Sequence, residues 1–226
     1  MKKTAVCTLF EGDYHHGVAA LINSLYANGF SGCFYAGYKG KLPTWVTQRL
    51  NQHDGKDNKN ASFQLDNGME VYFIELNPNM HFTNFKPYFL QQVWNEVNTD
   101  ITKIFYFDPD IVIRCKWDFF ENWIGFGVAL VHEITSNDMP VTSPIRKMWE
   151  RIILDEGDKI HNKIHSYINA GFFGLSKENG SFLENYIKYV EVGIHRFKMN
   201  EHVLAFSHRS EPFFARDQDA LNIAAT

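Results

Sequence analysis

Short apolar runs with the composition of buried strands alternate along the chain with segments whose apolar residues recur at helical spacing. Thr4–Phe10 and Cys33–Tyr38 are two such strand-like runs. Between them, apolar residues recur every three or four positions from Gly17 to Gly29, and a glycine after the last of them predicts the end of a helix. Further strands are predicted at Glu70–Leu76, Lys103–Phe107, Ile111–Ile113, Phe126–Val131 and within Tyr167–Leu175, and further helices after Pro43, from Pro87 onward and over about residues 144–154 and 181–192.

This alternation predicts an α/β fold with a mainly parallel sheet flanked by helices. Residues 51–68 are polar and rich in turn formers, so we expect an exposed loop there. No internal repeat or linker divides the chain, which favours a single domain over residues 1–226. In parallel sheets, ligands bind beyond the carboxyl ends of the strands. The polar residues in such positions are Glu11–Tyr14, Asp108–Asp110 and His132–Glu133.

Composition narrows the class of protein. The 226 residues are 45% hydrophobic and 21% charged, which argues against disorder, and a net charge of −4 without a long basic run argues against a nucleic-acid or anionic-membrane partner. The three cysteines, Cys7, Cys33 and Cys115, form no disulfide or metal-binding pattern. No stretch approaches the roughly 20 apolar residues of a transmembrane helix. We therefore expect a cytoplasmic protein without a transmembrane segment.

The segment KIFYFDPDIVI, residues 103–113, carries the clearest chemical signal. An apolar run leads to Asp108 and Asp110, which would face the same way in an extended chain. Pro109 favours that conformation because it pushes the preceding residue into the extended region. Two adjacent carboxylates repel each other, and Mn²⁺ or Mg²⁺ would remove that cost, with phosphate oxygens and water completing the ligand set.

Two other interpretations of this segment remain open. Asp-Pro-Asp can form a plain turn between two strands, although two acids at the end of a buried strand need a partner. An apolar strand followed by Asp-x-Asp also begins phosphohydrolases of the haloacid dehalogenase type. In those proteins the motif normally follows the first strand, whereas here about a hundred residues precede it.

Four separated blocks together resemble the GT-A glycosyltransferases, and most closely glycosyltransferase family 8, which includes glycogenin and bacterial galactosyl- and glucosyltransferases. The blocks are Thr8–Leu25 with Asp13-Tyr14, Phe85-Lys86-Pro87, FYFDPDIVI with the following VHE, and Asn169-Ala170-Gly171-Phe172 together with Asp217-Gln218-Asp219-Ala220-Leu221-Asn222. They cover nearly the whole chain in the family's order. Ala170 stands where the family usually has serine.

The resemblance implies a Rossmann-like GT-A fold, with residues 1–113 as the nucleotide-sugar-binding half and residues 114–226 as the acceptor-side half. It implies a metal-dependent hexosyltransferase that moves a sugar from a UDP-sugar to a glycan or other hydroxyl acceptor, with retention of configuration. The residues that it assigns to donor binding are Thr8, Tyr14, Lys86, Asp108, Glu133, Asn169 and Gly171, with Asp108 and Asp110 as metal ligands and Asp217 and Gln218 as the catalytic residues.

One departure from the family affects the expected activity. Family members usually continue beyond the Asp-Gln helix to a His-x-Gly…Lys segment that supplies a third metal ligand, which this sequence does not contain after Asn222. His208 precedes that helix and does not match. A catalytically silent nucleotide-sugar-binding protein is therefore an alternative to an active transferase.

Overall fold

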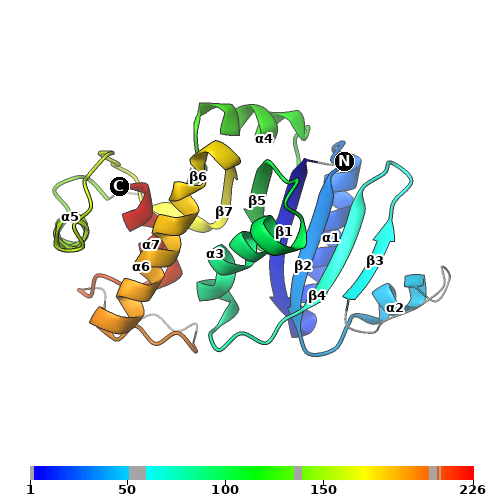
Figure 1. The fold of residues 1–226 in the computed structure, drawn as a ribbon, viewed down its shortest axis with the longest axis horizontal. Coiled ribbons are helices and arrows are strands. Elements are labelled where there is room, and N and C mark those ends of the chain that lie inside the picture. The colour runs from blue at the N-terminus through cyan, green and yellow to red at the C-terminus, as the bar shows by residue number, and fades with distance from the viewer. Residues whose placement is uncertain (1–2, 51–59, 135–138, 204–207, 209) are drawn as a thin grey trace.

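Seven strands form one mixed sheet in a computed structural model that describes residues 3–50, 60–134, 139–203, 208 and 210–226 (Figure 1). The strand order is β3-β4-β2-β1-β5-β7-β6. The strands are β1 (Thr4–Glu11), β2 (Cys33–Lys39), β3 (Asn60–Gln64), β4 (Glu70–Glu75), β5 (Lys103–Phe107), β6 (Ala129–His132) and β7 (Ile168–Ser176).

The four central strands β4, β2, β1 and β5 are parallel, as the alternating pattern predicts. β3 and β7 run antiparallel to their neighbours, so the sheet is mixed but mainly parallel. Because β7 is antiparallel to β5, its first residues lie at the edge where β5 ends, and Phe172 is opposite Phe107. The α/β class predicted from the sequence is thus confirmed.

Helices cover both faces of the sheet (Figure 1). Their bounds are α1 (His15–Ala27), α2 (Thr44–Leu50), α3 (Phe82–Gln92), α4 (Asp118–Trp123), α5 (Pro144–Asp155), α6 (Ser181–Phe197) and α7 (Asp217–Ala225). A 3₁₀ turn, Gly12–Tyr14, precedes α1, and a π-helical turn, Val93–Val97, continues α3.

The alternation of side chains along the strands produces two cores. In β1, Ala5 and Cys7 belong to the core under α3, α5, α6 and α7, whereas Val6 and Phe10 belong to the core under α1, α2 and α4. A strand buried on both faces reads as a continuous apolar run, which is why Thr4–Phe10 carries no polar alternation. The sheet is therefore the middle layer of three.

Several sequence-based boundaries were wrong. Residues 60–64 of the expected loop form β3, and residues 51–59 lie outside the described residues. The helix expected from Pro87 already begins at Phe82, since the His81 ring nitrogen accepts from Thr83 N–H and caps its first turn. Ile111–Ile113 is not a strand, and the strand expected from Phe126 begins only at Ala129.

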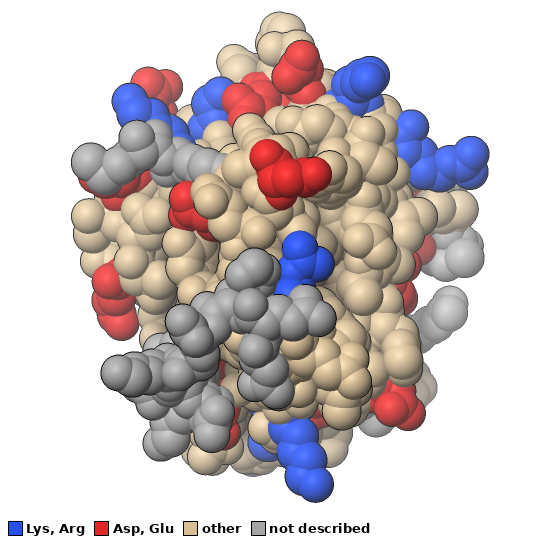
Figure 2. Space-filling view, turned by 90° about the vertical axis from the view of Figure 1, so that its right-hand side faces the viewer, with Lys and Arg blue, Asp and Glu red and all other residues tan. Residues whose placement is uncertain are grey.

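The right-hand face in Figure 1, where β3 and α2 lie, is shown in Figure 2. Uncharged residues dominate the described part of this face, and acidic and basic side chains are interspersed on it. Among the described residues, no helix combines the length and apolar character needed to cross a membrane.

Candidate functional site

Asp108 lies where β5 ends, beside the first residues of β7. Its N–H donates to Gly171 O at 2.8 Å, so the backbone of β7 fixes its position. Ile111 N–H donates to Asp108 O at 3.1 Å and closes a turn over Pro109 and Asp110. The Asp-Pro-Asp segment is therefore a turn and not the extended chain expected from the sequence. A proline is favoured inside such a turn because its φ is already suitable.

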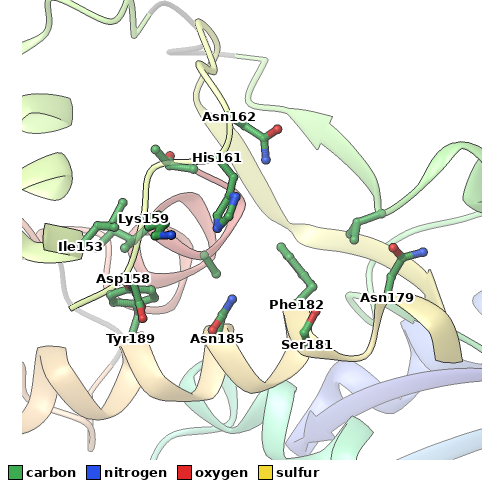
Figure 3. Close-up of a pocket in the computed structure, with 14 residues that line it drawn as sticks. Ile153, Asp158, Lys159, His161, Asn162, Asn179, Ser181, Phe182, Asn185 and Tyr189 are labelled. Carbon is green, nitrogen blue, oxygen red and sulfur yellow. Dashed lines mark hydrogen bonds between the residues drawn. The ribbon is translucent and has the colours of Figure 1, made fainter. Parts of the chain in front are cut away.

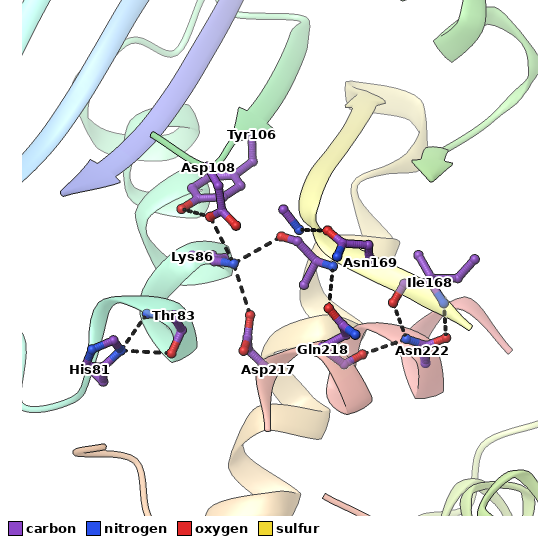
Figure 4. Close-up of polar contacts among 12 residues, drawn as sticks. His81, Thr83, Lys86, Tyr106, Asp108, Ile168, Asn169, Asp217, Gln218 and Asn222 are labelled. Atoms are coloured by element: carbon purple, nitrogen blue, oxygen red, sulfur yellow. Dashed lines mark hydrogen bonds and ion pairs between the residues drawn. The ribbon is translucent and has the colours of Figure 1, made fainter. Parts of the chain in front are cut away.

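The buried ammonium group of Lys86 connects the end of β5 to the start of α7 (Figure 4). Lys86 Nζ lies 3.1 Å from Asp108 Oδ1 and 3.2 Å from Asp217 Oδ2. It also donates to Ala170 O at 3.1 Å. One hydrogen-bond acceptor and two carboxylates thus lie around the buried charge, and the two ion pairs offset the cost of its burial.

Burial and charge act in opposite directions in this cluster. Burial lowers the pKa of Lys86, but the charges of Asp108 and Asp217 outweigh it, and the pKa of Lys86 is raised overall. Burial also raises the pKa of Asp217, and Lys86 only partly counters this effect. Lys86 therefore stays charged, while Asp217 accepts a proton more readily than an exposed aspartate.

Two tyrosines lie beneath the same cluster. Tyr106 O–H donates to Asp108 Oδ1 at 3.0 Å, from two residues earlier in β5. Burial raises the pKa of Tyr106, and the charge of Asp108 adds to the effect. Tyr186 of α6 is completely buried, and its pKa is raised by burial and by the charge of Asp217. Both tyrosines stay neutral beside the two carboxylates.

Side-chain amides join the start of β7 to α7. Gln218 Oε1 accepts from Ala170 N–H at 3.1 Å, and Asn169 Oδ1 accepts from Gly171 N–H at 2.7 Å. The Asn222 amide pairs with both backbone groups of Ile168, at 2.8 Å each. The amide side chains of the Asp-Gln-x-x-Leu-Asn segment thus place the first turn of α7 beside Asp108 (Figure 4).

Glu133 follows β6 and connects to the same network. Its Oε2 accepts from Asn169 Nδ2 at 2.7 Å and lies 3.5 Å from Gln218 Nε2. All three side chains are partly exposed. Lys86, Asp108, Glu133, Asn169, Gly171, Asp217 and Gln218, predicted from three separate blocks, therefore lie in one connected cluster.

The remaining predicted residues lie in β1, before α1 and in the Asp-Pro-Asp turn, and no hydrogen bond or ion pair among the described residues joins their side chains to this cluster. Thr8 is fully buried in β1, and its hydroxyl has no hydrogen-bond partner among the described residues. Tyr14 is 58% exposed and Asp110 is exposed. Gly17 connects the two parts, because an alanine Cβ there would lie 2.2 Å from Pro109 O. The first turn of α1 is thus next to the Asp-Pro-Asp turn.

The carboxylate oxygens at this turn supply part of a ligand set for a divalent cation. Tyr106 and Lys86 both contact Asp108 Oδ1, whereas no described residue donates to Asp108 Oδ2. That oxygen and the exposed carboxylate of Asp110 are hard ligands of the kind that Mg²⁺ and Mn²⁺ prefer. Among the described residues no group of three His, Cys, Asp or Glu side chains could hold a metal.

A cavity of about 300 Å³ lies elsewhere, between α6 and the end of α7 (Figure 3). Asp158, His161, Asn185 and Tyr189 are among its lining residues. β7 and α7 both run away from the Asp108 cluster toward this cavity, and no residue of the cluster lines it. The cavity is therefore separate from the candidate site.

Sequence reasoning missed several residues that hold the site. Tyr106 and Tyr186 read as ordinary core residues, and nothing in their spacing distinguishes them. Asp219 does carry a signal, as a buried acid in the first turn of α7. Tyr167 O–H and Ala215 N–H donate to its two oxygens at 2.7 and 2.6 Å.

A scan of the sequence against models of protein families finds no match, and a search of curated proteins finds none either.

Proposed function

We propose that the protein is a metal-dependent glycosyltransferase that moves a sugar from a UDP-sugar donor to a hydroxyl acceptor, with retention of configuration. The observation that carries the proposal is the Lys86 bridge between Asp108 and Asp217. It joins residues of three sequence blocks, 131 positions apart at the extremes, at the carboxyl edge of a parallel sheet. Ligands bind at that edge in open α/β sheets.

Each part of the cluster has a chemical role in this proposal. Mn²⁺ or Mg²⁺, held by Asp108 and Asp110, would act as a Lewis acid on the diphosphate leaving group. Tyr106 and Lys86 orient the Asp108 carboxylate by contacting Oδ1, which leaves Oδ2 for the ion. The first turn of α1 lies next to the Asp-Pro-Asp turn, and the exposed Tyr14, directly before α1, can contact the nucleoside.

The sugar would lie on the Glu133 side of the cluster. A sugar that departs from a diphosphate develops positive charge, which oriented carboxylate and amide oxygens stabilise. The amide oxygens of Gln218 and Asn169 accept from backbone N–H groups of β7, and their NH₂ groups face Glu133 Oε2, so the two amides pre-organise the Glu133 carboxylate for this role. Asp217 is buried and contributes its charge through Lys86, while Gln218 is the partly exposed member of the predicted catalytic pair.

A thermal-shift panel of nucleotide sugars tests the proposal, run with Mn²⁺ and again with a chelator. A ligand that binds only the folded state at about 100 times its Kd adds roughly 2.7 kcal/mol of stability. We expect one UDP-sugar to raise the melting temperature only in the presence of Mn²⁺. Asp110→Asn should abolish that shift, whereas Asp118→Asn, an exposed aspartate on α4, should not change it.

Other outcomes separate the alternatives. A metal-dependent shift without transfer to any acceptor and without donor hydrolysis would indicate a nucleotide-sugar-binding protein. Hydrolysis of a simple phosphate ester with Mg²⁺, without any nucleotide-sugar effect, would indicate a phosphohydrolase. A wild-type shift that persists in Asp110→Asn would contradict the proposed metal site.

A further inference from the structure

Arg216 has a strained backbone directly before Asp217 and Gln218. Its φ is +55° and its ψ is −115°, and Gln218 N–H donates to Ala215 O at 3.2 Å. These values define a type II′ turn with Arg216 in the position where glycine is strongly preferred. Of the described non-glycine residues only Lys198 shares a positive φ, in the ordinary left-handed conformation at the end of α6.

Strain of this kind persists where surrounding contacts hold the residue in place. The side chain of Arg216 is buried, and its Nη1 donates to Asn200 O at 2.6 Å. The guanidinium therefore connects the first turn of α7 to the segment that follows α6. A glycine would relieve the strain but could not make this contact.

The next carbonyl of that segment holds the start of α3. Glu201 O accepts from His81 N–H at 2.7 Å and from Asn84 Nδ2 at 3.1 Å. Asn84 is fully buried and lies half a turn before Lys86. Two adjacent carbonyls, of Asn200 and Glu201, thus connect the start of α7 with the start of α3.

We propose that Arg216 is a positioning residue that fixes the separation of Lys86 and Asp217 through residues 200 and 201. The two ion-paired residues stand on different helices, whose beginnings are joined by the pair itself, by Ala170, which contacts both Lys86 and Gln218, and by this bridge. By holding the two helix starts together, the bridge limits how far Lys86 and Asp217 can move apart before any ligand binds. A role of the bridge in catalysis rests on the proposed function, whereas its role in positioning the two side chains does not.

Three substitutions at position 216 distinguish the effect of the backbone strain from that of the guanidinium hydrogen bond. Arg216→Ala keeps the strained backbone and removes the guanidinium, Arg216→Gly removes both, and Arg216→Lys retains a cation. We expect Arg216→Gly to melt at a higher temperature than Arg216→Ala, because glycine adopts φ +55° without strain. Arg151→Ala, at an exposed position on α5, is the matched control.

Amide hydrogen exchange at residues 81–85 is the decisive measurement, because His81 N–H donates to Glu201 O, the carbonyl next to the one that Arg216 contacts. Exchange at the His81 amide should be at least tenfold faster in both Arg216→Ala and Arg216→Gly, and partly restored in Arg216→Lys. With an active donor, kcat should fall at least tenfold in both variants, while the donor KM stays within twofold.

If the Arg216→Gly variant shows the same exchange at residues 81–85 and the same kcat as the wild type, the proposal is overturned. Arg216 would then be only a turn residue. Should both substitutions prevent folding, Asn84→Ala weakens the bridge at its other end by removing one of the two hydrogen bonds to Glu201 O, and faster exchange at residues 217–222 is then expected. Unchanged exchange there would also overturn it. If the wild type transfers no sugar, the proposed function fails, while the exchange comparison still decides the bridge.

Discussion

Gly171 lies directly against the carboxylate of Asp108. An alanine Cβ at Gly171 would be 3.0 Å from Asp108 Oδ2 and 2.8 Å from Asn169 Oδ1. Since Asp108 N–H also donates to Gly171 O at 2.8 Å, the two residues are held together through the backbone. The absence of a side chain at position 171 therefore determines where the oxygen proposed to bind metal can lie.

Gly171→Ala should weaken metal-dependent donor binding more than it weakens the fold. The added methyl group would rotate the Asp108 carboxylate away, and we expect the Mn²⁺-dependent thermal shift to decrease while the apo protein loses about 1–3 kcal/mol. Gly125→Ala is the control, because its Cβ would meet nothing within 4 Å. Equal donor-induced shifts in both variants would contradict this role of Gly171.

Gly17→Ala should destabilise the protein through backbone crowding. Its Cβ would lie 2.2 Å from Pro109 O, and a backbone atom cannot move aside as a flexible side chain can. We expect α1 and the Asp-Pro-Asp turn to separate, with a loss of about 1–3 kcal/mol in the free energy of unfolding measured with urea. A loss below about 0.5 kcal/mol would show that the helix start adjusts without strain.

Lys86→Met should leave two carboxylates without their shared cation. Removal of one partner of a buried ion pair costs about 3–5 kcal/mol, which urea unfolding at pH 7 would detect. The pKa of Asp217, already raised by burial, should rise further, so the folded variant binds more protons than the unfolded chain above the normal aspartate pKa. Stability of the variant should therefore fall as pH increases.

Lys147→Met is the control for this substitution. Lys147 Nζ lies 2.7 Å from Glu150 Oε2 in an exposed pair on α5. Exposed pairs contribute about 0–1 kcal/mol, so this variant should resemble the wild type at every pH. Similar losses in the Lys86 and Lys147 variants would contradict the structural importance of the Lys86 bridge.

Titration of Asp219 should make the free energy of unfolding decrease as pH rises. Burial raises its pKa to about 8, and the hydrogen bond from Tyr167 only partly counters this. Because the pKa in the folded state exceeds that in the unfolded chain, stability is greatest below about pH 4 for this group and is lost as pH rises toward 8. Each pH unit within that window changes stability by at most about 1.4 kcal/mol.

Asp219→Asn removes this titration while keeping a similar side-chain shape. The difference in unfolding free energy between wild type and variant, measured with urea from pH 4 to pH 9, should shift in favour of the variant as pH rises. A constant difference over that range would show that Asp219 does not titrate in the window.

The sequence determined the class of fold and most of the strands. A strand buried on both faces must be apolar at every position, and a helix with one buried face must repeat at helical spacing, so Thr4–Phe10, Lys103–Phe107 and the helix over residues 15–27 are visible locally. The antiparallel strand β3 was missed because its residues, NASFQ, are mostly polar and continue a turn-rich segment.

The sequence also indicated which residues form the candidate site, since Lys86, Asp108, Asn169, Asp217 and Gln218 were all singled out from their motifs. Their arrangement was decided only by tertiary structure. The carboxylate of Asp108 is shared with a lysine 22 positions earlier and is close to an aspartate 109 positions later, and no local pattern encodes either contact. The Asp-Pro-Asp segment shows the same limit: its residues permit an extended chain or a turn, and the contacts with Gly171 and Gly17 select the turn. The extended and turn conformations of a short segment differ little in free energy, whereas burial of charged groups without partners costs far more. The tertiary contacts therefore decide the geometry.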